Sequence, residues 1–146
     1  MLHGGGPTQV INATLAGVVD ECRRRNLAPL YGARYGIEGV LARDLIDLNR
    51  YDPAHIAAIG RTPGSALGSS RAKVAAEDYA RMLEILRDLD IRSVFCNGGN
   101  GSMYMAHQLA SAAEGAGYEL RVIGIPKTID NDIAGTDHTP GYGSTA

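Results

Sequence analysis

The segment "PKTIDND", residues 126–132, places several side chains suited to phosphoryl transfer in one short loop. Asp130 and Asp132 bring two carboxylates one residue apart, and Lys127 adds a cation on a mobile stem. Transfer of a phosphoryl group to an alcohol needs a base near the hydroxyl and a metal ion near the phosphates. The two carboxylates could divide these roles while the lysine neutralises phosphate charge. The alternative is an Asx-type turn with surface acids, a common setting for a single aspartate.

Two glycine-rich segments, "GGGPTQVIN" (residues 4–12) and "NGGNGS" (residues 97–102), have features of phosphate-binding loops. Glycine permits positive φ angles and close approach of the backbone, and the N–H groups of a following helix attract anions. Ser102 is predicted to cap the helix after the second segment. The first segment alone is equally compatible with a tight turn before a capped helix. Together they predict a polyphosphate site across adjacent helix N-termini, although neither matches the Walker or dinucleotide-binding pattern.

Arg71 ends the glycine- and serine-rich loop at residues 60–71. A guanidinium in this position suits a phosphate clamp, because it can donate two parallel hydrogen bonds to one anion. The alternative is a solvated arginine before a helix. The histidines at positions 3, 55, 107 and 138 show no metal-ligand spacing and are predicted to be surface or satisfied residues.

The composition describes an ordinary globular domain of 146 residues, 45% of them hydrophobic, with a net charge of −2. A chain without a basic field is unsuited to nucleic acid or an anionic membrane surface. Cys22 and Cys96 lie in apolar patterns and are predicted to be buried, reduced thiols. No apolar run approaches the ~18 residues of a membrane span. The sequence therefore predicts a cytoplasmic protein.

The hydrophobic pattern alternates strands with helices. The first helix is predicted over residues 10–25, with Thr8 as its N-cap and Asn26 as its stop. Strands are predicted at 28–32, 92–96 and 120–125, and further helices or helical turns at 36–45, 53–59, 75–89 and 102–114.

The predicted strands are continuously apolar, which is typical of a parallel sheet covered on both faces. We therefore expect a three-layer α/β domain with a mostly parallel sheet. Ligands of such sheets bind at the carboxyl ends of the strands, where the loops at 4–9, 97–102 and 126–137 are expected. Residues 1–2 leave almost no strand before the first glycine loop and "GYGSTA" stops within a loop, which predicts a fragment truncated at both ends.

Taken together, these segments resemble the 6-phosphofructokinase family, and most of all the branch that includes pyrophosphate-using enzymes. The blocks that match in order and spacing are "GGPTQVINA", "GIEGVL", "LGSSR", "GGNGS", "PKTIDNDI" and "GTDHTPGYGS". They cover nearly the whole chain, and "PKTIDNDI" is the most specific of them. The resemblance implies that residues 1–146 are a partial N-terminal, phosphoryl-donor-binding domain with a Rossmann-like sheet.

The resemblance also implies roles for individual residues. Asp130 matches the base that takes the proton from the 1-hydroxyl of fructose 6-phosphate, with Lys127 and Arg71 as further catalytic residues. The sugar phosphate is expected to contact Thr128, Ile129 and Asp130. The expected donor-binding residues are Gly5, Arg71, Ala72, Gly99, Asn100, Gly101 and Ser102.

The expected magnesium site departs from the family pattern. The family loop commonly reads Gly-Gly-Asp-Gly, and its aspartate serves Mg²⁺, whereas this chain has Asn100. A neutral amide is a weaker ligand for a hard cation, so either Asp132 or the donor's own oxygens with water are expected to carry more of the metal. The family also uses residues from a later part of its chain and completes the sugar pocket from a neighbouring subunit, which implies a homo-oligomer for the full-length protein.

The phosphoryl donor is predicted from two positions that point in opposite directions. In the family, an acid just after the metal-loop position accompanies pyrophosphate use, but here that residue is Gly101, which leaves room for an α-phosphate. Lys127 instead matches pyrophosphate enzymes. Because a repulsive group excludes a ligand whereas a lysine only adds attraction, ATP is favoured and pyrophosphate is the alternative. An alternative of another class is a non-catalytic phosphate- or nucleotide-sensing module, against which Asp130 and Lys127 argue.

Overall fold

A computed structural model, which describes residues 1–145, has an α/β fold built on a three-stranded parallel sheet. Its strands are β1 (Leu2–His3), β4 (Ser93–Gly98) and β5 (Arg121–Pro126), in the order β1-β4-β5. β4 pairs with β5 along its whole length, whereas β1 pairs only with Cys96 and Asn97. The prediction of an α/β fold with a parallel sheet is confirmed.

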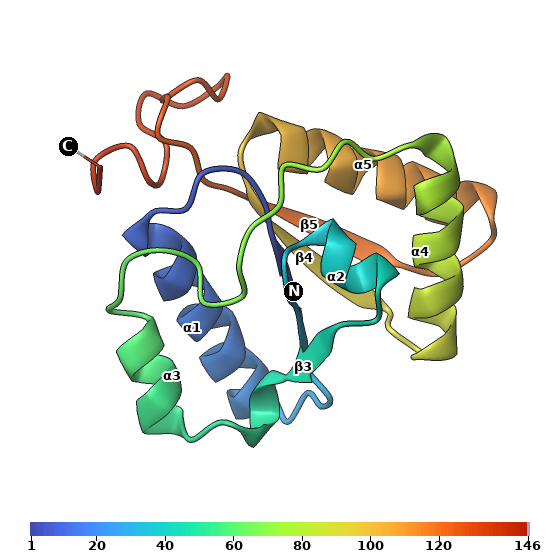
Figure 1. Cartoon of the computed structure of the whole chain (residues 1–146), viewed down its shortest axis with the longest axis horizontal. Coiled ribbons are helices and arrows are strands. Elements are labelled where there is room, and N and C mark those ends of the chain that lie inside the picture. Colours follow the sequence, from blue (N-terminus) through green and yellow to red (C-terminus); the bar gives the residue numbers. More distant parts are fainter. Residues whose placement is uncertain (146) are drawn as a thin grey trace.

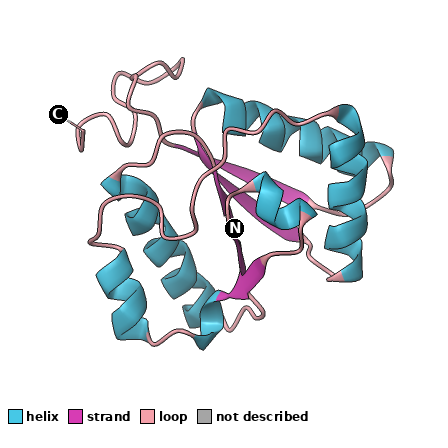
Figure 2. Cartoon of the chain, in the orientation of Figure 1, coloured by secondary structure: helices cyan, strands magenta, loops and turns pink. Residues whose placement is uncertain are grey.

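Helices lie on both sides of this sheet (Figures 1 and 2), although β5 remains partly exposed, with Ile123 at 40% exposure. Helices α1 (Gln9–Arg24) and α3 (Pro53–Ile59) lie on one side, and α4 (Ala76–Asp88) and α5 (Asn100–Gly115) lie on the other. The Asp52 side chain accepts a hydrogen bond from the Ala54 amide at 2.7 Å, which caps α3 ahead of its proline.

Two hydrophobic clusters hold the layers together. One packs the sheet against α4 and α5 and includes Met82, Val94, Cys96 and Leu109, all buried. The other lies between α1 and α3, where Leu15 and Val19 of the helical stripe meet Ile56 and Leu67. Burial of each large apolar side chain in these clusters contributes roughly 1.5–3 kcal/mol to the stability of the fold.

The segment between α1 and α3 differs in part from the prediction. Residues 28–32 were expected to form a strand of the parallel sheet, and residues 36–45 a helical turn. The helical turn is confirmed by α2 (Ile37–Leu41), but the strand differs: β2 (Tyr31–Ala33) pairs antiparallel with β3 (Leu45–Asp47) in a separate sheet. A 3₁₀ turn (Leu48–Arg50) follows β3. The connection is too short for the crossover that a parallel pair needs, so the chain reverses direction.

The ends of α1 agree with the sequence. Thr8 has the extended backbone of an N-cap residue, although its side chain makes no capping hydrogen bond. Asn26 follows the helix with a φ of 54°, a left-handed conformation that asparagine tolerates and that stops a helix. Both cysteines are buried free thiols, as predicted.

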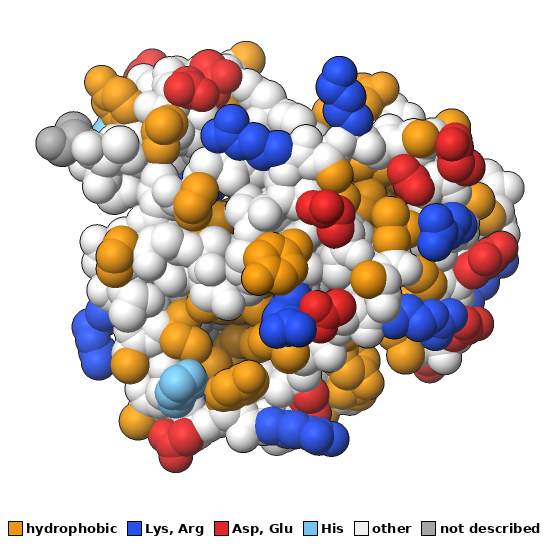
Figure 3. All heavy atoms as spheres, viewed as in Figure 1, with side chains coloured by type: hydrophobic (Ala, Val, Ile, Leu, Met, Phe, Trp, Pro, Cys, Tyr) orange, Lys and Arg blue, Asp and Glu red, His pale blue; other side chains and the backbone are white. Residues whose placement is uncertain are grey.

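The surface in Figure 3 carries lysine, arginine and acidic side chains interspersed, with no continuous basic area on this face. Among residues 1–145, no helix is long and apolar enough to cross a membrane. The cytoplasmic location stays a prediction.

Candidate functional site: glycine loops at the carboxyl edge of the sheet

The three loops predicted to bind ligand meet at the carboxyl ends of β1, β4 and β5. The Gly4 amide donates to the Asn97 carbonyl at 2.9 Å, and the Lys127 amide donates to the Gly98 carbonyl at 2.8 Å. The loop at residues 60–71 joins them, because the Gly5 amide donates to the Ser70 carbonyl at 3.2 Å. Backbone hydrogen bonds therefore fix four chain segments around one point.

Gly98 is required for packing, and Gly4 lies against the same serine side chain. A Cβ atom at either position would collide with Ser102 Oγ, and one at Gly98 would also lie 2.6 Å from the Gly4 carbonyl oxygen. Ser102 was predicted to be the helix cap, and that prediction was wrong. Helix α5 begins at Asn100 with Gly99 as its N-cap, so Ser102 lies in the first turn and fills the space between the strands.

Gly5, Gly99 and Gly101 are different, because the space around them is open. A Cβ atom at Gly101 would meet nothing within 4 Å, and one at Gly99 would meet only ordinary contacts at 3.6 Å or more. Gly5 has a φ of 73°, which side chains rarely adopt. The open glycines line the approach to the N-terminus of α5, where free N–H groups and the helix dipole favour an anion.

A cavity of about 620 Å³ opens beside these glycines. Six of the seven predicted donor-binding residues line it: Gly5, Arg71, Ala72, Gly99, Gly101 and Ser102. The seventh, Asn100, does not line it. The remaining wall is largely apolar and includes Val74, Tyr79 and Tyr104.

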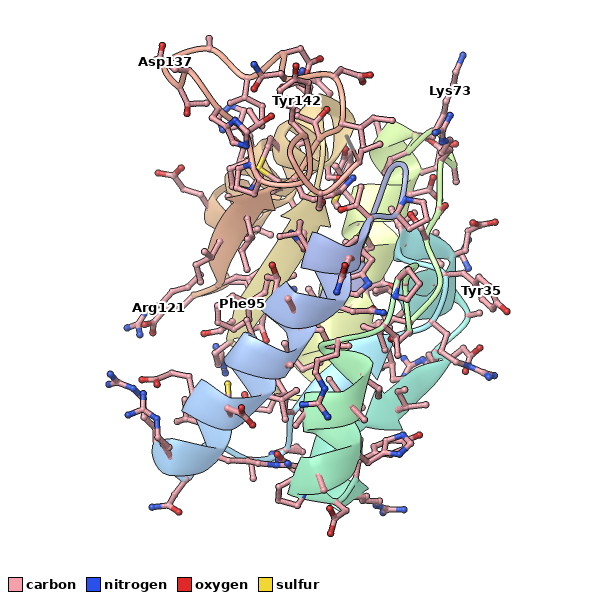
Figure 4. All side chains as sticks on the ribbon, turned by 90° about the vertical axis from the view of Figure 1, so that its left-hand side faces the viewer. Tyr35, Lys73, Phe95, Arg121, Asp137 and Tyr142 are labelled. Atoms are coloured by element: carbon pink, nitrogen blue, oxygen red, sulfur yellow. The ribbon has the colours of Figure 1, made fainter. Side chains whose placement is uncertain are left out.

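Several other lining residues were not among the predicted site residues, including His3, Lys73, Tyr79 and Tyr104. Tyr79 lies in the helix predicted over residues 75–89, and nothing in a helical period separates a core tyrosine from one at a cavity wall. Lys73 lies two residues after Arg71 and points outward in Figure 4. A second cation so close to a suspected phosphate clamp is the signal that could have identified it.

Lys127 was expected to be a mobile cation, but its side chain is 2% exposed and fixed. The ammonium donates to the Gly6 carbonyl, and Gly141 packs against the stem, where a Cβ atom would lie 3.1 Å from Lys127 Cγ. Burial lowers the pKa of Lys127, Asp130 raises it and Arg71 lowers it. The lysine therefore bridges the first glycine loop and the "PKTIDND" loop.

His3 is also buried, unlike the three other histidines, which are exposed. The Ser65 hydroxyl donates to the Gly68 carbonyl at 2.7 Å, so it accepts from His3 Nδ1, also at 2.7 Å. This arrangement places the proton of the neutral ring on Nδ1 and leaves Nε2 without a hydrogen-bond partner among residues 1–145. Burial lowers the pKa of His3 to about 4. The imidazole therefore supports the glycine loop as a neutral group.

The predicted acceptor residues lie next to the cavity rather than in its wall. Thr128 is buried, and its hydroxyl accepts a hydrogen bond from the Asp130 amide at 3.1 Å. Ile129, Asp130 and Asp132 are exposed. No group among residues 1–145 donates a hydrogen bond to the Asp130 carboxylate, which leaves it available as a base.

The two predicted metal ligands lie against each other. Asn100 Nδ2 donates to Asp132 Oδ2 at 2.7 Å, so the amide nitrogen faces the carboxylate. The part of the chain that the structure describes contains no group of three or more His, Cys, Asp or Glu side chains that could hold a metal ion. An oxygen-ligated cation at this point would therefore need donors from the substrate or from water.

The family model for phosphofructokinase matches residues 1–146. The chain belongs to the phosphofructokinase family.

Similar proteins in this family include enzymes named for different donors. The chain is 48% identical to a pyrophosphate–fructose 6-phosphate 1-phosphotransferase from Xanthomonas campestris, over 99% of this chain and 35% of that protein. It is 35% identical to an ATP-dependent 6-phosphofructokinase from Haemophilus influenzae, over 97% of this chain and 42% of that protein. The chain thus spans between a third and a half of the length of these relatives.

Solved phosphofructokinase structures have the same fold. The chain superposes on the pyrophosphate-dependent phosphofructokinase of Nitrosospira multiformis with a TM-score of 0.91 and 38% identity, covering 97% of this chain and 36% of that one. The enzyme from Marinobacter aquaeolei matches with a TM-score of 0.91 and 40% identity, over the same shares.

Proposed function

We propose that this chain forms the phosphoryl-donor side of a 6-phosphofructokinase active site. The reaction transfers the γ-phosphoryl group of ATP to the 1-hydroxyl of fructose 6-phosphate and gives fructose 1,6-bisphosphate and ADP. The hydroxyl proton leaves to Asp130 as the new P–O bond forms and the bond to ADP breaks. The observation that carries the proposal is the convergence of the open glycines, Arg71 and Lys127 beside the loop of Asp130.

The donor phosphates would lie over Gly99 and Gly101, at the N-terminus of α5. Three positive features surround this position: the helix N–H groups, Arg71 at the cavity wall and Lys127 on the Gly6 carbonyl. Such fixed donors stabilise the charge that spreads over the phosphoryl oxygens during transfer. Fructose 6-phosphate would contact Thr128, Ile129 and Asp130, and a neighbouring subunit of a homo-oligomer would complete its pocket.

ATP is favoured as the donor by the shape and lining of the cavity. Pyrophosphate is a small, fully polar anion, whereas much of this cavity of about 620 Å³ is lined by apolar groups. Tyr79 and Tyr104 offer faces for a purine, and Tyr104 is 65% exposed. Gly101 leaves the path from the phosphates into the apolar part open.

Magnesium is the metal that fits the oxygen donors present. Asp132 would hold it together with phosphate oxygens and water, and Asn100 would add at most a neutral oxygen. When bound, the ion would neutralise charge on the β- and γ-phosphates.

Pyrophosphate is the second candidate, and Lys127 supports it. The buried ammonium is fixed against Gly6, where it would face the second phosphate of a short donor. The names of the Xanthomonas and Nitrosospira relatives agree with this candidate.

A donor assay on a full-length protein that contains this chain tests the proposal. Turnover of fructose 6-phosphate is measured with ATP and with pyrophosphate, for the wild type and for Gly101→Asp. We expect the wild type to use ATP, and Gly101→Asp to lose roughly 100-fold in kcat/KM for ATP, because a like-charge contact costs several kcal/mol. Activity of the wild type with pyrophosphate alone would overturn the choice of ATP. Binding of either donor without turnover would instead favour a sensing module.

The matched control is Gly101→Asn. It adds a side chain of similar size without the charge, in a space where a Cβ atom meets nothing within 4 Å. We expect it to retain more ATP activity than Gly101→Asp. Equal losses in the two variants would show that volume, rather than charge, decides the donor.

A further inference from the structure

The loop that carries the two aspartates folds on itself through one asparagine. Asn131 has a φ of 52° and lies between Asp130 and Asp132. Asn131 Nδ2 donates to the Asp137 carbonyl at 3.1 Å. Asn131 Oδ1 accepts from the Thr139 amide at 2.9 Å and from the Thr139 hydroxyl at 3.1 Å. Both ends of this one side chain are therefore bound to the returning segment of the loop.

The partner of Asn131 is itself fixed. Thr139 is fully buried, and its hydroxyl lies 3.4 Å from the Thr128 carbonyl. One residue further on, the Pro140 carbonyl accepts from the Thr128 amide at 3.0 Å, which closes the base of the loop. Figure 4 shows the loop beyond the ends of the strands, with Asp137 at its outer edge. The loop thus has a defined shape although it contains no helix or strand.

The neighbours of Asn131 face the other way. Asp130 and Asp132 are exposed, whereas Asn131 is half-buried. Among residues 1–145 nothing donates a hydrogen bond to the Asp130 carboxylate, so only the backbone fixes its direction. That backbone is held by the contact between the Asp130 amide and Thr128 on one side and by Asn131 on the other.

We propose that Asn131 and Thr139 form a clamp that positions the carboxylate of Asp130 for phosphoryl transfer. Asparagine suits the position because it tolerates a left-handed φ and has both a donor and an acceptor. Reactive groups must be held close to their productive geometry, and a displacement of about 1 Å can cost about 100-fold in rate. The proposal rests on the proposed function, because it takes Asp130 as the base.

The test measures kcat and KM in a full-length protein that contains this chain, with three substitutions. Asn131→Gly removes the clamp and keeps a residue that accepts positive φ. Thr139→Val removes the hydroxyl at nearly constant volume, and Thr139→Ser restores it. Thr136→Val is the matched control, because Thr136 is exposed and, among residues 1–145, its hydroxyl forms hydrogen bonds only with His138 of the same loop.

We expect Asn131→Gly and Thr139→Val to lower kcat by about 10- to 100-fold, with the donor KM within about twofold of wild type. Thr139→Ser should recover most of the turnover lost in Thr139→Val, and Thr136→Val should behave as wild type. Rates are compared well below the melting temperature of each variant, so that a loss of stability alone leaves kcat unchanged. Normal kcat in Asn131→Gly, or Thr139→Ser as slow as Thr139→Val, would overturn the clamp.

A double substitution separates failure of the clamp from failure of the proposed function. If the clamp acts through Asp130, adding Asn131→Gly to Asp130→Asn lowers kcat no further, because the two residues act as a unit. A multiplied loss would show that Asn131 acts elsewhere and would overturn the proposal. Wild-type turnover in Asp130→Asn alone would overturn the proposed function itself, whatever Asn131→Gly does.

Discussion

The glycine loop at residues 97–102 and the aspartate loop at residues 127–141 lie side by side but are built differently. The first is fixed by the sheet, by the start of α5 and by the packing of Gly4 and Gly98 around Ser102. The second has no regular structure and depends on side-chain hydrogen bonds to Asn131 and Thr139. Backbone N–H groups on a rigid frame suit a charged donor, whereas a loop can aim individual carboxylates. Substitutions in the first loop should therefore affect stability and donor binding, and those in the second should affect turnover.

Asp130→Asn tests this division with the largest expected effect. Removal of a general base lowers kcat by about 10²- to 10⁴-fold, because the amide cannot take the hydroxyl proton. The side chain is exposed and accepts no hydrogen bond among residues 1–145, so folding should be unaffected. Steady-state kinetics and thermal denaturation of the full-length protein check both expectations. A large fall in melting temperature would show that the aspartate loop also has a structural role.

The buried His3 ring, next to the first glycine loop, should make the stability of the chain depend on pH. Its pKa is lowered from 6.5 to about 4, so the folded chain binds fewer protons at this ring than the unfolded chain does. As far as His3 is concerned, the free energy of unfolding is therefore highest above pH 6.5 and decreases as the pH falls from 6.5 to about 4. The difference between the two pKa values corresponds to a loss of up to about 3 kcal/mol in the free energy of unfolding at low pH.

The control for this prediction is His3→Gln, which stays neutral over the same range. Urea unfolding at several pH values is measured for both proteins, and the difference between them isolates the histidine. We expect the wild type to lose stability relative to His3→Gln as the pH falls below 6.5. Parallel curves would show that the His3 ring is as accessible to protons in the folded chain as in the unfolded one.

The contrast between the closely packed Gly98 and the open Gly101 gives the next largest expected effect, which is on stability. Gly98→Ala should destabilise the chain by about 1–3 kcal/mol, because the methyl group would collide with Ser102 Oγ and with the Gly4 backbone. Gly101→Ala should be neutral or slightly stabilising, since its Cβ would lie in open space within a helix. Urea denaturation of the two variants checks the contrast. Similar stabilities would mean that the packing of the strand ends is not tight.

These contrasts also mark what the sequence could predict. The alternation of strands and helices identified the parallel sheet, because continuous apolar strands need cover on both faces. Glycine at 98 and glycine at 101 look the same in a sequence, although one is required by packing and the other lies open. The burial of Lys127 depends on Gly141, which follows it by 14 residues in a loop without any periodic pattern. Contacts between irregular segments leave no local signal, so these features needed the structure.

Asn100→Asp is the prediction with the smallest effect, and it acts where the two loops touch. The substitution replaces the hydrogen bond to Asp132 with a like-charge contact, which an exposed pair relieves partly through solvent. Mg²⁺ would relieve the repulsion further by binding to both carboxylates, so we expect the Mg²⁺ concentration at half-maximal turnover to fall by about 10-fold. Melting temperatures measured with and without Mg²⁺ supply a second readout, and the variant should gain more from the ion than the wild type. Asn100→Ala separates the causes, because it removes the hydrogen bond and adds no charge. If Asn100→Asp and Asn100→Ala respond to Mg²⁺ alike, residue 100 lies outside the metal site, and the contact with Asp132 only joins the glycine loop to the aspartate loop.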